Sequence, residues 1–177
     1  MKSTLLIESI KTQVDQFIFI AQELKNRPLE ELVNRPSNDA WNTLECLAHL
    51  NRYSDYYLPA IEKAIGKQSL SDDVDFKSGW IGGYMARMIL PKAKLNKMRT
   101  FAEMNPINSM VGKEEIDVFI ENQKKLISLL DLSSKVSLTK TMIPTTISKF
   151  INMRLGDAFQ FLANHSLRHM KQIESLQ

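Results

Sequence analysis

The sequence predicts an all-α protein built as a four-helix bundle, and three observations lead to this prediction. Four long segments repeat apolar residues at alternating steps of three and four, which is the spacing of one helix face. No segment shows a convincing strand pattern. An irregular stretch between the second and third long segments predicts an extra short helix or loop insertion there. At 177 residues the chain is long enough to bury a core, and we expect a single domain over residues 1–177.

The first two helices are expected near the N-terminus. The first ends near Asn26, because Pro28 disfavours helix at the residue before it. The segment 36–39 offers N-cap residues for the second helix, which spans Trp41–Ile65. Pro59 should bend or interrupt that helix. The apolar stripe of the first helix consists of Leu6, Ile10, Val14, Phe17, Ala21 and Leu24.

The middle of the chain gives weaker patterns. A short helix over Ile81–Leu90 would end at Pro91. Five basic residues and no acidic ones lie from Arg87 to Arg99, which indicates either a solvated surface segment or a cationic rim that attracts an anionic substrate. The third long helix is expected from near Lys113 to residues 133–134.

The remaining stretch, Val136–Met153, is rich in Thr, Ile and Val and contains Pro144. A single strand would have nothing to pair with, so we expect an ordered crossover loop. The last helix spans Leu155–Ser175, and His165 and His169 continue its apolar stripe.

The three histidines of the chain are the candidate metal ligands. His165 and His169 lie one helical turn apart, and His49 lies at the edge of the stripe of the second helix. Three imidazoles can bind one divalent metal and leave an open coordination position, as in reactive rather than structural sites. The alternative is a set of core histidines that satisfy their nitrogens by hydrogen bonds.

Composition excludes several classes of protein. The hydrophobic fraction of 44%, the charged fraction of 24% and the net charge of +3 are ordinary for a soluble globular protein and do not predict binding to nucleic acid. No apolar run approaches the roughly 20 residues of a membrane span, so we expect no membrane partner. The single cysteine, Cys46, is expected to be a small buried residue in a reducing compartment. Without a recognisable signal peptide, the expected location is cytoplasmic.

Two motifs together resemble the DinB/YfiT-like superfamily of small helical metalloproteins, which is unrelated to the lesion-bypass polymerase of similar name. The motifs are W-N-x-x-E-C-L-A-H-L at Trp41–Leu50 and F-L-A-N-H-S-L-R-H-M-K-Q-I at Phe161–Ile173. The resemblance implies a DinB-like four-helix bundle in which His49, His165 and His169 hold a metal, commonly nickel or zinc. It also implies, for members of known activity, S-transfer with a low-molecular-weight thiol or isomerisation of maleylpyruvate.

Three functions follow as expectations. The first is a metal-dependent, thiol-dependent S-transferase acting on a small-molecule substrate, favoured by the resemblance. The second is a metal-dependent hydrolase, for which Glu45 is the candidate acid, base or acceptor for an imidazole N–H. The alternative interpretation of Glu45 is an ordinary surface carboxylate. Tyr53 is the candidate residue that orients the substrate. The third is a non-catalytic metal-binding or dimerising bundle, and a homodimer is compatible with the composition.

Overall fold

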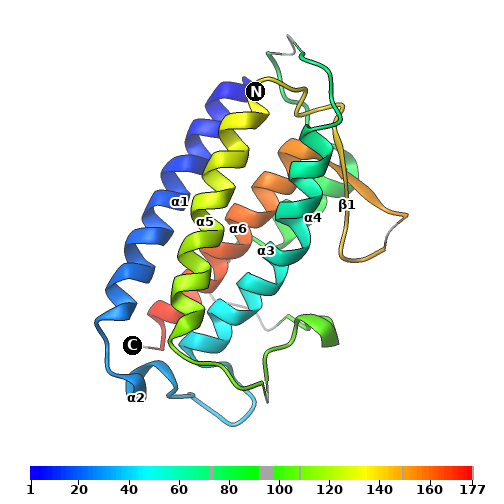
Figure 1. Ribbon diagram of the computed structural model, residues 1–177. Helices are drawn as coiled ribbons and strands as arrows, with labels where there is room; N and C mark the ends of the chain where they lie inside the picture. Colours follow the sequence, from blue (N-terminus) through cyan, green and yellow to red (C-terminus); the bar gives the residue numbers. More distant parts are fainter. Residues whose placement is uncertain (72–73, 92–97, 108, 149, 177) are drawn as a thin grey trace.

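Four long helices form a bundle, as the sequence predicts, with two helices running in one direction and two in the other (Figure 1). The computed structural model describes residues 1–176 apart from 72–73, 92–97, 108 and 149. Helices α1 and α3 each pack against both α5 and α6, so the four helices surround one core. The bounds of the long helices are α1 Ser3–Lys25, α3 Thr43–Ile65, α5 Glu114–Ser133 and α6 Leu155–Glu174.

Each long helix contributes a large aromatic side chain that is almost completely buried in the core of the bundle. Phe17, Tyr57, Phe119 and Phe159 are all at most 2% exposed, and aliphatic residues of the same stripes fill the space between them. Burial of each such side chain contributes roughly 1.5–3 kcal/mol. The apolar periodicity of the sequence is therefore the main determinant of this fold.

Shorter elements surround the bundle. Helix α2 (Leu29–Leu32) follows α1, and α4 (Trp80–Met88) with the 3-10 helix η1 (Ala102–Met104) lie between α3 and α5. Helix α4 lies in the stretch where a short helix over Ile81–Leu90 was expected, and it runs from Trp80 to Met88. Three of the five basic residues of the expected surface segment or cationic rim, Lys92, Lys94 and Lys97, lie outside the described residues.

Helix α3 begins later than expected. Its N-cap is Asn42, outside the segment 36–39, and the side chain of Asn42 accepts a hydrogen bond from the backbone N–H of Glu45. The carboxylate of Glu45 in turn accepts from the backbone N–H of Asn42, which completes a capping box. The helix also continues past Pro59 without interruption. Pro59 and Asp55 are both exposed, so water can solvate the carbonyl of Asp55 that the proline leaves without an N–H partner.

The prediction of a crossover loop before α6 is wrong. Strands β1 (Met142–Pro144) and β2 (Asn152–Arg154) form an antiparallel hairpin in which Ile143 pairs with Met153. Each strand finds its partner within the same segment, so the objection to an isolated strand does not apply. The hairpin leads directly into Leu155, the first residue of α6.

Helix α4 lies against α6, the helix that carries two of the histidines. The carboxylate of Asp157 in α6 accepts hydrogen bonds from the hydroxyl of Ser78 at 2.6 Å and from the backbone N–H of Gly79 at 2.8 Å. A Cβ on Gly82 would lie 2.5 Å from Cβ of Asp157, so only glycine allows this close approach. Among the described helices, none combines the length and hydropathy that crossing a bilayer requires.

Candidate metal centre

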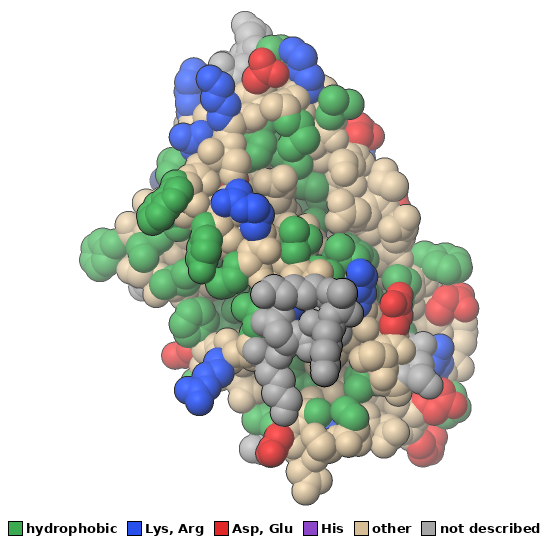
Figure 2. Space-filling model, turned by 180° about the vertical axis from the view of Figure 1, so that it is seen from behind, with side chains coloured by type: hydrophobic (Ala, Val, Ile, Leu, Met, Phe, Trp, Pro, Cys, Tyr) green, Lys and Arg blue, Asp and Glu red, His purple; other side chains and the backbone are tan. Residues whose placement is uncertain are grey.

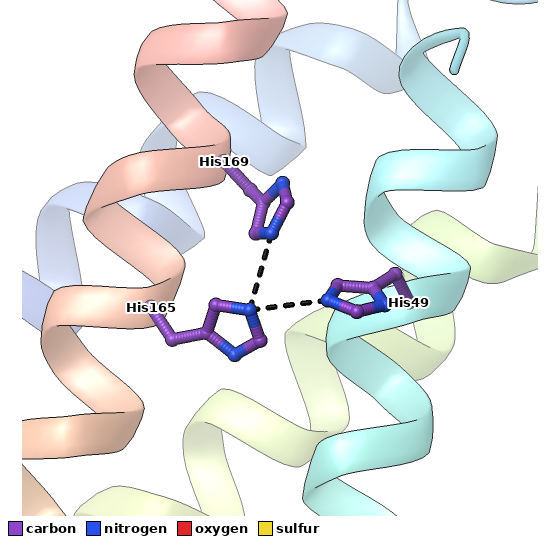
Figure 3. Close-up of side chains that lie close together, drawn as sticks. All are labelled: His49, His165 and His169. Carbon is purple, nitrogen blue, oxygen red and sulfur yellow. Dashed lines mark hydrogen bonds between the residues drawn. The ribbon is translucent and has the colours of Figure 1, made fainter. Parts of the chain in front are cut away.

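The three histidines that the sequence singles out meet inside the bundle (Figure 3). His49 extends from α3, and His165 and His169 extend from successive turns of α6. Nε2 of His165 lies 3.1 Å from Nε2 of His49 and 3.1 Å from Nε2 of His169. The three nitrogen atoms therefore converge on one point between α3 and α6.

The outer nitrogens of two rings have defined hydrogen-bond partners. Nδ1 of His49 donates to the backbone carbonyl of Met104 at 2.7 Å, and Nδ1 of His169 donates to Oε1 of Gln172 at 3.0 Å. Because a carbonyl oxygen can only accept, the proton of each neutral ring is on Nδ1. The Nε2 atoms of His49 and His169 consequently direct lone pairs toward His165.

Burial keeps these rings neutral. The side chains of His49, His165 and His169 are 2%, 3% and 6% exposed. Burial lowers the pKa of His49 to about 4, and it places the pKa values of His165 and His169 well below the usual value, an effect that the neighbouring histidines reinforce. Neutral imidazole is the form that binds metal ions.

The arrangement fits a divalent transition metal. A single proton on Nε2 of His165 can be donated to only one of its two neighbours, whereas one cation can accept all three lone pairs. Tetrahedral bonds of 2.0–2.1 Å place ligand nitrogens roughly 3.3 Å apart, close to the 3.1 Å of two nitrogen pairs here. Nδ1 of His165 has no hydrogen-bond partner among the described residues, so this ring is not held by a network of the kind expected for core histidines.

Aromatic rings form the walls of the cluster. The ring centroid of Trp41 lies 4.6 Å from that of His49 and 5.8 Å from that of His169. Tyr53 lies at 5.0 Å from His49 and 4.5 Å from His165. Burial raises the pKa of the Tyr53 hydroxyl, so this group stays protonated and can donate a hydrogen bond. The candidate substrate-orienting residue is thus in contact with two of the three imidazoles.

Both carboxylate oxygens of Glu45 have partners other than the imidazoles. One carboxylate oxygen accepts from the backbone N–H of Asn42 and the other pairs with the guanidinium of Arg35. The alternative interpretation of Glu45 as a surface carboxylate is wrong, since its side chain is fully buried. Cys46 beside it is also buried, and burial raises the pKa of its thiol, so the expectation of a small buried residue is confirmed.

Some residues of the site were not recognised as such from the sequence. The side chain of Gln172 holds His169, and its i+3 spacing from that histidine is a usable signal. Trp41 opens a recognised motif, but its ring contacts with the histidines require the fold. The contribution of Met104 is a backbone carbonyl, which has no side-chain signature.

Arg52 holds the segment that supplies this carbonyl. Its guanidinium donates to the backbone carbonyl of Asn105 at 2.5 Å and to the hydroxyl of Ser109 at 2.7 Å, with a longer contact of 3.4 Å to the carbonyl of Glu103. Arg52 lies one turn after His49 on α3, so the same helix presents the imidazole and fixes its hydrogen-bond acceptor. The orientation of His49 therefore depends on both Arg52 and the carbonyl of Met104.

Comparison with protein families supplies independent information. The family described as the DinB superfamily matches residues 20–173, a region that contains all three histidines and most of the bundle. Comparison with curated proteins and with solved structures found no match.

Proposed function

This chain belongs to the DinB superfamily, and from that premise we propose that it is a metal-dependent enzyme that joins a low-molecular-weight thiol to a small electrophilic substrate. The observation that carries the proposal is the convergence of three neutral Nε2 atoms from His49, His165 and His169. Imidazole ligands suit nickel and zinc among the divalent ions, and these are the metals that we infer. A divalent ion held there would supply the positive charge that deprotonates a thiol near neutral pH.

The protein's own residues prepare the site for this chemistry. The carbonyl of Met104 and the amide oxygen of Gln172 hold the Nδ1 protons of two rings, which fixes the tautomer that presents Nε2 as a ligand. Trp41 and Tyr53 exclude water from the sides of the cluster. We assign to the Tyr53 hydroxyl the role of donating a hydrogen bond to the substrate.

The position of Glu45 favours thiol transfer over hydrolysis. A hydrolase needs a general acid or base near the attacking water. In the described part of the chain, no carboxylate is hydrogen-bonded to the three imidazoles, and both oxygens of Glu45 are held by other partners. A thiolate needs no such base once it has formed. A catalytic role for Glu45 would require its carboxylate to leave Asn42 and Arg35.

A cobalt-substituted protein tests the proposal. Cobalt would be introduced into the metal-depleted protein, and its visible spectrum followed while thiols such as cysteine, glutathione and bacillithiol are added. Thiolate binding would produce an intense sulfur-to-cobalt charge-transfer band, and the same thiol should disappear when a generic arylating electrophile is added. A spectrum that no thiol changes, together with cleavage of an activated ester by the same preparation, would reject thiol transfer in favour of hydrolysis.

A further inference from the structure

Helix α4 carries an apolar stripe on its outer face. Its inner face, with Gly82, Gly83, Met85 and Ala86, is buried in the protein, and the helix packs on α6. The outer face carries side chains whose exposed fractions are large for apolar residues. These are Trp80 at 89%, Ile81 at 40%, Tyr84 at 60% and Met88 at 43%. A helix of nine residues that is apolar on both faces is expected to have a second packing partner.

We propose that this partner is α4 of a second copy of the same chain, in an antiparallel homodimer whose two-fold axis passes beside Tyr84. The stripe is symmetric about that residue. Trp80 and Met88 lie four residues before and after Tyr84, and Ile81 and Arg87 lie three residues before and after it. An antiparallel pair centred on Tyr84 therefore brings Trp80 of each copy against Met88 of the other, and Arg87 of each against Ile81 of the other. Such self-complementarity is what an isologous dimer interface requires.

The chemistry of these pairs is favourable. A methionine sulfur next to an indole ring is an attractive contact. The two Tyr84 rings would meet at the axis, where offset aromatic stacking is favourable. Arg87, the one charged residue of the outer face, would lie near the aromatic rings of the other copy, where a guanidinium is stabilised by the ring faces.

The exposed apolar area is comparable to the share that one partner contributes to a standard interface. The hairpin β1–β2 adjoins α4 and adds Met142, Ile147 and Phe150, which are 48%, 49% and 95% exposed. In Figure 2 the hairpin projects to the left, and hydrophobic side chains gather on that side of the molecule. Together with the stripe of α4 they offer apolar area on the order of 800 Å², about what each partner contributes to a standard interface.

Charge around the stripe gives the dimer a distinctive response to salt. Among the described residues, Lys77, Arg87 and Arg154 lie on or beside α4 and the hairpin, and Arg154 donates to the backbone carbonyl of Lys77. An isologous dimer through α4 brings two such sets of positive charge together. Added salt screens this repulsion and should strengthen the dimer. An anionic partner, such as an acidic membrane surface, would be released by salt instead.

Matched cysteine variants locate the interface. Tyr84→Cys places two thiols at the proposed axis, whereas Phe19→Cys places one on α1 at a side chain of similar exposure, 63%. The native Cys46 is buried and should not compete. We expect copper–phenanthroline, which oxidises two thiols to a disulfide, to crosslink the Tyr84→Cys protein rapidly into dimers and to leave the Phe19→Cys protein largely monomeric.

Sedimentation velocity provides the second readout. The wild type and Phe19→Arg should sediment as dimers that tighten with salt. Tyr84→Arg should sediment as a monomer, and its circular dichroism spectrum should show that it is folded. The proposal is overturned if the wild type is monomeric at all concentrations, if Phe19→Cys crosslinks as fast as Tyr84→Cys, or if the protein pellets with phosphatidylserine vesicles in a salt-sensitive manner while remaining monomeric.

Discussion

The histidine cluster depends on residues that hold each ring from outside. His49 and His169 have a carbonyl-type acceptor on Nδ1, while Nδ1 of His165 has no partner among the described residues. Acceptors of this kind set both the tautomer and the orientation of a metal-binding imidazole. At the scale of single residues, we therefore expect changes at these acceptors to alter metal affinity without altering the fold.

Gln172→Leu removes the acceptor of His169 while keeping a side chain of similar size. We expect metal affinity to fall by about 10-fold to 100-fold, the usual effect of losing such a partner. The measurement is a competitive zinc titration against a chromophoric chelator. Gln172→Glu keeps an acceptor oxygen and is the control that should retain affinity. Equal affinity of Gln172→Leu and the wild type would show that this hydrogen bond does not position the ligand.

The lowered pKa of His49 makes the metal-free protein sensitive to acid. Folding lowers this pKa from 6.5 to about 4. Between pH 6.5 and about 4 the unfolded chain therefore binds a proton that the folded chain does not. The contribution of neutral His49 to the free energy of unfolding is fully present above pH 6.5 and decreases as pH falls toward 4. Chemical denaturation of the chelator-treated protein between pH 4 and 8 measures this slope. His49→Gln should flatten it, and an unchanged slope in that variant would contradict the assignment.

At the scale of elements, the apolar periodicity predicted the long helices, because each buries one stripe in a common core. It also predicted that the two histidines of α6 face inward, since they continue that stripe. The hairpin was missed because its two short strands are recognisable only once they are paired. The Met104 carbonyl was missed because any residue has one. Sequence patterns describe side chains, whereas the hairpin and the Met104 carbonyl depend on the positions of backbone groups in the folded chain.

The contact of α4 with α6 depends on Gly82. In Gly82→Ala the new Cβ would lie 2.5 Å from Cβ of Asp157, so α4 must shift, at a cost of about 1–3 kcal/mol typical of overpacking. Urea denaturation measures this cost. Gly66→Ala is the matched control, because the nearest atom to its Cβ, the carbonyl oxygen of Glu62, is at an ordinary 3.5 Å. Equal stability of the two variants would argue against the close packing.

Arg52 connects α3 to the segment that contains η1. Arg52→Ala removes hydrogen bonds to Asn105 and Ser109, so we expect faster amide hydrogen exchange over the described residues 102–107 and weaker zinc binding, because His49 loses its fixed acceptor. Lys63→Ala, on the same helix, controls for the loss of one basic side chain. If exchange in this segment is the same in both variants, Arg52 does not hold it.

At the scale of the whole molecule, metal binding and folding are expected to be coupled. The ligands come from α3 and α6, which are separate in sequence and adjacent in the bundle, so the site exists only in the folded chain. A metal that binds the folded state alone stabilises it in proportion to the logarithm of its concentration. The proposed dimer through α4 would act on the same bundle, because α4 packs on the helix that supplies two ligands.

His49, His165 and His169 are proposed to bind one divalent ion together. The most direct test is metal content by mass spectrometry of untagged protein, with His49→Ala, His165→Ala and His169→Ala measured alongside. We predict about one nickel or zinc ion per chain in the wild type, lost in each variant, and a melting temperature that falls on chelation and recovers with added metal. Protein that contains no transition metal, and whose melting temperature does not respond to added zinc or nickel, would contradict the account.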